Sequence, residues 1–144
     1  MSNNNCNLLL IEDNEDDVFF MQRALDKAEI RLPLQVAADG QEAMDYLSGT
    51  GKFSDSQSIP MPSLIFLDLK LPFVSGFEFL TWLRKHPQHW QLPVVILTSS
   101  SEERDRQTAE TLAVKDYLVK PPTPEMLLAT LQQNLAQTEV PVIA

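Results

Sequence analysis

Four apolar residues stand directly before an aspartate in segment 64–68, which reads Leu64-Ile65-Phe66-Leu67-Asp68. Short apolar runs bounded by polar residues are typical of strands buried on both faces, as in a parallel sheet. Three other runs have the same form: residues 8–11 before Glu12 and Asp13, 94–97 before Thr98, and 117–119 before Lys120. Ligands of such sheets bind outside the carboxyl ends of the strands. The sequence therefore predicts that these polar groups converge on one rim, an arrangement suited to phosphoryl transfer onto Asp68.

Strand-like and helix-like patterns alternate along the chain. Strands are expected over about 7–12, 34–38, 64–67, 94–97 and 117–119, and helices over about 15–28, 40–48, 76–86, 102–112 and from 124. Asn14 and Thr123 stand where the first and last helices need N-caps. Such alternation favours right-handed βαβ units with helices on both faces of one sheet. The predicted fold class is therefore α/β, a single (βα)5 doubly wound parallel sheet of flavodoxin-like order 2-1-3-4-5.

Composition narrows the class of protein. The 144 residues can bury one adequate core, so we expect one domain. Acidic residues outnumber basic ones by 20 to 11, and the net charge of −9 argues against direct DNA binding. The single cysteine, Cys6, cannot form an internal disulfide, which fits a reducing compartment. We find no signal-peptide pattern and no apolar run long enough to span a membrane, so we expect a cytoplasmic protein with no membrane partner.

Five fragments, in the order of the predicted strand ends, resemble a known family. They are Ile11-Glu12-Asp13-Asn14, Leu67-Asp68-Leu69-Lys70-Leu71-Pro72, Gly76, Leu97-Thr98-Ser99 and Tyr117-Leu118-Val119-Lys120-Pro121. Over about residues 6–136 the chain resembles the response regulator receiver domain (CheY-like) of bacterial two-component signalling, which leaves 137–144 as a C-terminal tail. Within that family, segments 39–43, 46–53 and 116–121 are similar to the stand-alone Rcp-type regulators paired with cyanobacterial phytochrome kinases.

The resemblance implies a role for each polar group at the rim. Asp68 would be the phosphoacceptor, whose carboxylate attacks a phosphohistidine on a kinase and becomes an acyl phosphate, a known form of covalent catalysis. Thr98 and Lys120 would hold the phosphoryl oxygens, as a hydroxyl donor and a point charge. Tyr117 would be the aromatic switch of the family, and the Lys120-Pro121 bond would be its cis peptide.

The acidic residues also imply a cofactor. Two like charges about 4 Å apart repel by roughly 4 kcal/mol at a surface-like effective dielectric, so Glu12 and Asp13 need a cation. Mg²⁺ suits them because it takes few protein oxygens, keeps waters and associates with phosphate. The resemblance implies direct ligation by Asp13, Asp68 and the main-chain carbonyl of Lys70, with Glu12 acting through water. The acids at 15–17 fit a solvated first turn stabilised by the helix dipole instead.

Each of these residues also has an ordinary interpretation. Taken alone, Asp68 would be a turn residue before Leu71-Pro72, and Thr98 would be a helix cap. Lys120 would be a surface lysine, and Tyr117 an amphipathic ring at a strand edge. The five matching fragments together outweigh these interpretations, because perturbed carboxylates cluster at functional sites.

Three other classes of protein compete with the receiver. A Mg²⁺-dependent phosphatase of haloacid-dehalogenase type also uses a strand-end aspartate, but it needs a second acid two residues on, where Lys70 stands. A flavodoxin-like cofactor module needs a Gly-rich phosphate loop after the first strand, where Asp13-Asn14-Glu15 stands. A pseudo-receiver, which binds partners without phosphorylation, would not need the intact set of acids, hydroxyl and lysine.

We therefore expect a phosphorylatable single-domain response regulator. It is not a classical enzyme, but it would catalyse its own phosphorylation and a slow self-dephosphorylation. Its partner would be a sensor histidine kinase, with a phytochrome as the candidate. Its signal would pass by contact with a downstream protein or by onward phosphotransfer. The very polar helix at 102–112 has little to bury and is expected to move between states.

Two further segments are candidates for contacts between proteins. The tail at 137–144 contains branched apolar residues, and we expect a homodimer through the fifth strand, its flanking helices and this tail. The long connection 49–62 is either a tolerated insertion or a partner contact. Trp82 and Trp90 are expected to be packing residues.

Overall fold

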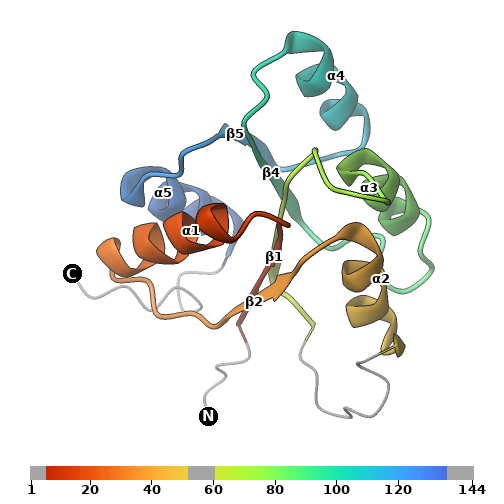
Figure 1. The fold of residues 1–144 in the computed structure, drawn as a ribbon, viewed down its shortest axis with the longest axis horizontal. Helices are drawn as coiled ribbons and strands as arrows, with labels where there is room; N and C mark the ends of the chain where they lie inside the picture. The colour runs from red at the N-terminus through yellow and green to blue at the C-terminus, as the bar shows by residue number, and fades with distance from the viewer. Residues whose placement is uncertain (1–5, 52–60, 136–144) are drawn as a thin grey trace.

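A five-stranded parallel sheet organises the molecule (Figure 1). The structure is a computed structural model that describes residues 6–51 and 61–135. Its strands are β1 (Leu8–Ile11), β2 (Leu34–Ala37), β3 (Leu64–Leu67), β4 (Val94–Thr98) and β5 (Asp116–Val119). They lie in the order β2-β1-β3-β4-β5, and every neighbouring pair runs parallel. The predicted fold class and strand order are confirmed.

Helices follow the strands and cover both faces of the sheet. They are α1 (Glu15–Lys27), α2 (Gly40–Ser48), α3 (Gly76–Arg84), α4 (Glu103–Thr111) and α5 (Pro124–Asn134), each close to its predicted range. Figure 1 shows α1 and α5 on one face, and α2, α3 and α4 on the other. The expected doubly wound arrangement is therefore present.

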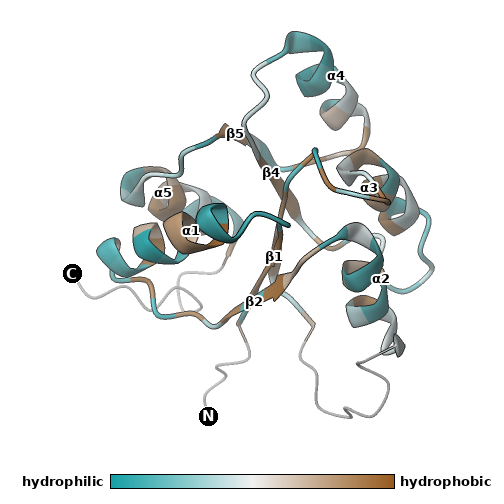
Figure 2. Cartoon of the chain, in the orientation of Figure 1, coloured by the Kyte–Doolittle hydropathy of each residue, from teal (hydrophilic) through white to brown (hydrophobic). Residues whose placement is uncertain are grey.

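Successive strand residues point to opposite faces, so the sheet has a core on each side. The residues that pack with α1 and α5 include Leu8, Leu10, Leu64 and Phe66. Those that pack with α2 and α3 include Leu9, Ile11, Ile65 and Leu67. Each of these side chains is 0% or 1% exposed. Burial on both faces explains why the strands are continuous apolar runs. Figure 2 shows brown strands between helices whose colour alternates between brown and teal.

Polar side chains begin the helices at the carboxyl edge of the sheet. The side chain of Asn14 accepts the N–H of Asp17 at 3.1 Å, and that of Thr123 accepts the N–H of Met126 at 3.1 Å. Both predicted N-caps are confirmed. Because each cap satisfies a main-chain donor that the helix leaves free, the caps fix where α1 and α5 begin beside the rim.

Gly76 allows α3 to begin directly against the end of β3. A Cβ at this position would meet the main-chain carbonyl of Asp68 and would lie 2.7 Å from the Cα of Leu69. Backbone atoms cannot yield to such an approach without moving the chain. Glycine therefore holds the loop after Asp68 close to the first turn of α3.

One of the two tryptophans differs from its expectation. Trp82 packs against the core beside Phe79, as predicted, but Trp90 is 50% exposed. The guanidinium of Arg84 donates to the carbonyls of Trp90 at 3.0 Å and of Leu92 at 2.8 Å. Hydrogen bonds to main-chain carbonyls therefore hold the connection between α3 and β4 in place. The indole ring of Trp90 is left at the surface.

Part of the predicted contact surface lies outside the described residues. These residues are 52–60, within the 49–62 connection, and the whole tail at 137–144. The two alternatives for the connection, a tolerated insertion or a partner contact, therefore stay open, and the homodimer predicted through the tail stays a prediction. Within the described ranges, we find no helix whose length and apolar character would let it cross a bilayer.

Candidate functional site

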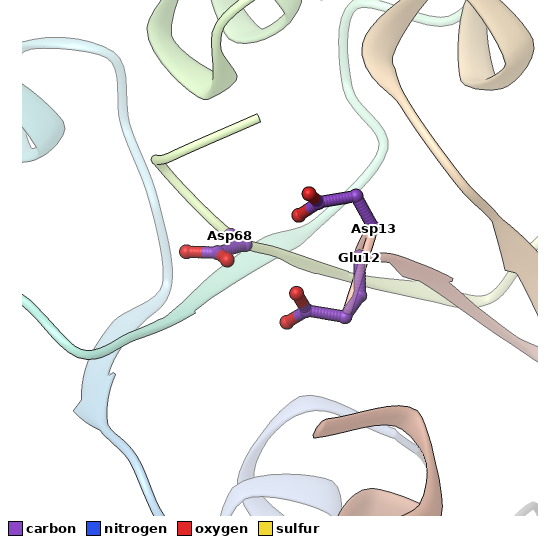
Figure 3. A group of neighbouring side chains, drawn as sticks. All are labelled: Glu12, Asp13 and Asp68. Carbon is purple, nitrogen blue, oxygen red and sulfur yellow. The ribbon is translucent and has the colours of Figure 1, made fainter. Parts of the chain in front are cut away.

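Three carboxylates meet at the carboxyl edge of the sheet. Glu12 and Asp13 follow β1, and Asp68 follows β3, the strand beside β1. One ligand oxygen from each lies within 4.8 Å of the others, and Figure 3 shows how the three side chains gather. Glu12 is 3% exposed and Asp68 is 5% exposed, whereas Asp13 is open to solvent. Carboxylates this close, two of them buried, require neighbouring positive charge.

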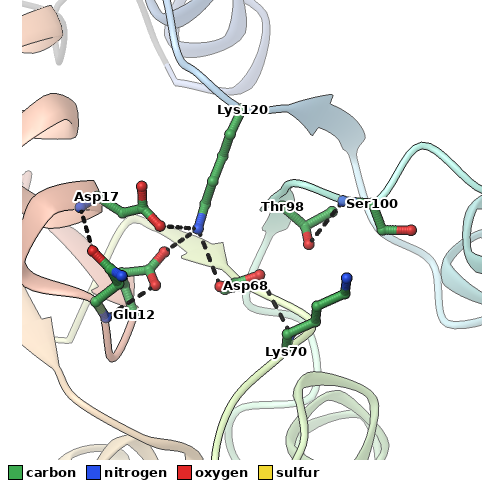
Figure 4. A network of polar contacts seen from close by, with 8 residues as sticks. Glu12, Asp17, Asp68, Lys70, Thr98, Ser100 and Lys120 are labelled. Carbon is green, nitrogen blue, oxygen red and sulfur yellow. Dashed lines mark hydrogen bonds and ion pairs between the residues drawn. The ribbon is translucent and has the colours of Figure 1, made fainter.

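Lys120, directly after β5, brings positive charge to this cluster (Figure 4). Its Nζ lies 2.6 Å from Oε1 of Glu12 and 3.1 Å from Oδ2 of Asp68. It also lies 2.7 Å from Oδ2 of Asp17 in the first turn of α1. An ammonium has three N–H donors, and here each can point to a different carboxylate.

Burial and charge act in opposite directions on these groups. Burial alone lowers the pKa of Lys120, but the carboxylates of Asp17, Glu12 and Asp68 outweigh it and raise that pKa above its ordinary value. Burial raises the pKa of Glu12, and the ion pair with Lys120 lowers it in part. The ammonium therefore stays charged at neutral pH and gives the cluster one fixed positive charge.

Thr98, at the end of β4, is fully buried, and Ser100 connects it with α4 and β5. The Oγ1 of Thr98 accepts the N–H of Ser100 at 3.5 Å. The hydroxyl of Tyr117 donates to the carbonyl of Ser100 at 2.9 Å, and the guanidinium of Arg106 lies 4.6 Å from the centre of the tyrosine ring. Burial raises the pKa of Tyr117. The hydroxyl of Ser100 donates to Asp105 of α4 at 2.6 Å.

Backbone groups complete the rim. The N–H of Lys70 donates to Oδ1 of Asp68 at 3.3 Å, while the residue itself is exposed. The N–H of Lys120 donates to the carbonyl of Thr98 at 2.8 Å, which joins the ends of β4 and β5. The bond between Lys120 and Pro121 is cis, as the resemblance implied. The polar groups that follow β1, β3, β4 and β5 thus lie on one edge of the sheet.

Asp17 is the residue of this network that the sequence analysis missed. The acids at 15–17 are predicted to be a solvated first turn, and two of them are exposed. The prediction is wrong for Asp17, whose side chain is only 31% exposed and pairs with Lys120. Helical periodicity could have revealed that Asp17 faces the interior. Asp17 lies four residues before the fully buried Met21, so both are on the inward face of α1.

Comparison with known proteins identifies the family. The model of the response regulator receiver domain matches residues 8–132. Response regulator Rcp1 of Synechocystis sp. is 37% identical over 113 residues, which cover 78% of this chain and 75% of Rcp1. The solved Mn²⁺-bound form of Rcp1 has a TM-score of 0.73 at 33% identity, covering 95% of this chain and 98% of that one.

Two other solved structures are similar over nearly the whole chain. The bacteriophytochrome response regulator AtBRR has a TM-score of 0.80 at 36% identity and covers 90% of this chain and 91% of its own. The phosphorylated cyanobacterial phytochrome response regulator RcpA has a TM-score of 0.77 at 30% identity. The match covers 94% of this chain and 98% of the RcpA chain. With the family model spanning most of its length, the chain belongs to the response regulator receiver domain family.

Proposed function

We propose that this receiver accepts a phosphoryl group on the carboxylate of Asp68. Phosphorylation on an aspartate is general to the family to which the chain belongs. The observation that carries the assignment is the position of Asp68: buried at the carboxyl edge of the sheet, with Oδ2 3.1 Å from the ammonium of Lys120. A carboxylate beside a fixed positive charge is suited to receive an anionic group.

The side chains at the rim divide the chemistry among them. An oxygen of Asp68 attacks phosphorus, the N–P bond of a phosphohistidine breaks, and the imidazole leaves with the electron pair. Lys120 exchanges its contact with Asp68 for one with a phosphoryl oxygen, which spreads the developing negative charge. The buried hydroxyl of Thr98 donates to a second phosphoryl oxygen. These proposed roles are supported by the positions of the three residues, which stand at the ends of the neighbouring strands β3, β4 and β5 on one edge of the sheet.

The carboxylate cluster fits Mg²⁺. Its three carboxylates offer hard oxygen ligands that lie within 4.8 Å of one another. We propose that Asp13, Asp68 and the main-chain carbonyl of Lys70 hold the ion directly, and that Glu12 acts through water. Bound Mg²⁺ would supply charge neutralisation between the carboxylates and the incoming phosphoryl group. The Mn²⁺-bound form of the similar Rcp1 supports a divalent cation at this rim.

Asp13→Asn is expected to weaken Mg²⁺ binding by about tenfold or more, because it removes a directly ligating charge. Glu12→Gln should weaken it less, since the contact of Glu12 is proposed to pass through water. Titration calorimetry with MgCl₂ measures both affinities. Asp16→Asn is the matched control, because it removes an exposed carboxylate nearby. Equal affinities of wild type and Asp13→Asn would contradict the ligand assignment.

We further propose that the phosphoryl group is long-lived. Lys70 and Ser100 stand two residues after Asp68 and Thr98, at positions expected to flank the line of water attack. Neither is suited to accept a proton or to orient that water, and the hydroxyl of Ser100 is already hydrogen-bonded to Asp105 at 2.6 Å.

Lys70→Asn is therefore expected to speed self-hydrolysis by about tenfold, because an amide at this position can orient the attacking water. The decay of the phosphorylated mass after removal of the phosphodonor gives the rate. Lys85→Asn, the same change at another exposed lysine, should leave the rate unaltered. A lifetime that Lys70→Asn leaves unchanged would refute this account.

The proposed output surface lies around α4 and β5. In α4 only Ala109 is buried, so packing holds this helix weakly. Ser100 reaches both Asp105 of α4 and the hydroxyl of Tyr117. We propose that a shift of Thr98 toward the phosphoryl group passes through Ser100 to Tyr117 and α4, with Tyr117 as the switch.

A histidine kinase is the partner that the family implies. Because Rcp1 is a relative and the phosphorylated phytochrome regulator RcpA is a structural neighbour, we propose a phytochrome kinase as the phosphodonor. The signal then passes by protein contact or onward phosphotransfer. Profiling of phosphotransfer from a panel of purified histidine kinases, phytochromes included, tests the partner. Fastest labelling by a kinase of another class would overturn the phytochrome proposal and leave the receiver assignment standing.

A further inference from the structure

Asp17 occupies a place in the network of Lys120 that differs from that of the other carboxylates. Glu12 and Asp68 belong to the cluster of carboxylates that could hold a cation, together with Asp13. Asp17 contacts Lys120 at 2.7 Å and is not part of that cluster. Figure 4 shows the ammonium between Asp17 on one side and Asp68 on the other. A cation and a phosphoryl group at the rim would engage Glu12 and Asp68, but would leave the carboxylate of Asp17 to Lys120.

The start of α1 sets the main-chain position from which the carboxylate of Asp17 extends. The side chain of Asn14 accepts the N–H of Asp17 at 3.1 Å, and the N–H of Asn14 donates to Oε2 of Glu12 at 3.2 Å. The cap of α1 is thus hydrogen-bonded to the same glutamate that pairs with Lys120. One short segment therefore sets the positions of two of the three acceptors around the ammonium.

Lys120 needs such an anchor because its side chain is long. A lysine has a flexible four-carbon stem and high rotamer entropy, so its ammonium is precise only where neighbours hold it. We propose that Asp17 is a positioning residue that holds the ammonium of Lys120 in line with the phosphoryl group on Asp68. The assignment rests on the proposed phosphorylation of Asp68. Asp17 touches neither the phosphoryl group nor the cation, and it acts only through Lys120.

The chain offers a closely matched control for this proposal. Asp16 is the adjacent acid on the same first turn of α1, and it is exposed. Asp16→Asn and Asp17→Asn remove the same charge from the same helix end, so both have the same effect on net charge and a similar one on the helix dipole. Only Asp17→Asn removes one of the three charged partners of Lys120. Asp17→Glu keeps that charge and lengthens the side chain by one methylene.

The first readout is the rate of phosphorylation of the full chain by acetyl phosphate at saturating Mg²⁺, followed by intact mass. Asp17→Asn is expected to be roughly tenfold slower than wild type, as loss of one charged hydrogen bond predicts. Asp16→Asn should stay within about twofold of wild type, and Asp17→Glu should recover most of the lost rate. Equal rates for Asp17→Asn and Asp16→Asn, or a faster rate for Asp17→Asn, would overturn the proposal.

The second readout needs no phosphorylation. In ¹⁵N-lysine-labelled protein with Mg²⁺, the ammonium resonance of Lys120, assigned by its loss in Lys120→Arg, should exchange slowly in wild type and in Asp16→Asn. It should broaden strongly in Asp17→Asn and sharpen again in Asp17→Glu. An unchanged resonance in Asp17→Asn would overturn the proposal. Failure of wild type to be labelled at all would instead remove the proposed function, and the resonance would still decide whether Asp17 holds Lys120.

Discussion

Asp68→Asn is expected to abolish phosphorylation. Wild-type protein treated with acetyl phosphate and Mg²⁺ should gain one phosphoryl group by intact mass, because an oxygen of the Asp68 carboxylate attacks phosphorus. The amide that replaces it has no anionic oxygen and cannot form the acyl phosphate. Asp68 is 5% exposed, so the substitution also tests whether a buried carboxylate is the acceptor.

A control substitution and a chemical test of the phosphorylated product make this experiment specific for Asp68. Asp26→Asn makes the same change at an exposed position near the end of α1 and should leave labelling intact. Neutral hydroxylamine, which cleaves acyl phosphates and spares phosphate esters, should remove the group from wild type. The assignment of Asp68 would be contradicted if the wild-type mass stayed unmodified under conditions that label another receiver. Labelling that persists in Asp68→Asn would contradict it as well.

Lys120→Met should lower the free energy of unfolding by about 3 kcal/mol in the absence of Mg²⁺, because it leaves buried carboxylates without their cation. The side chains of Lys120, Glu12 and Asp68 are 12%, 2% and 7% exposed, so solvent compensates little for the loss. Urea denaturation monitored by circular dichroism measures the change. Mg²⁺ should restore part of the stability, since its binding neutralises the same carboxylates.

Lys115→Met is the control for this stability effect. Lys115 is exposed directly before β5 and undergoes the same loss of charge. Its substitution is expected to change stability by less than about 0.5 kcal/mol. Equal stability losses in the two variants would show that Lys120 contributes only a general surface charge, contrary to the contacts with Glu12 and Asp68.

Local sequence patterns were sufficient for the elements of the fold. The run at 64–67 is apolar at every position because β3 lies in the middle of the sheet, where both faces are covered. The starts of α1 and α5 were readable because Asn14 and Thr123 satisfy main-chain donors only three residues away. The exposure of Trp90 was not readable, because the guanidinium of Arg84 binds the main-chain carbonyl of Trp90 while it also reaches the carbonyl of the distant Leu112.

The candidate site likewise has one part that the sequence predicts and another that only the tertiary structure shows. The positions of Glu12, Asp68 and Thr98 follow from strand ends, because parallel strands place their carboxyl ends on one edge. The hydrogen bonds of Ser100 with Asp105 and Tyr117 depend instead on how the loop after β4 approaches α4 and β5. No local pattern specifies these partners.

By itself, the sequence determined the five strands, four of them as apolar runs, the helices between them and the rim on which the acids, hydroxyl and lysine gather. Those features follow from hydrophobic periodicity and from capping, which act over a few residues. Only the tertiary structure decided that Asp17, apparently one of three solvated acids, reaches Lys120 across 103 positions of sequence. The physical reason is that packing of α1 on the sheet turns one side of its first turn inward, where a buried ammonium can pair with a carboxylate.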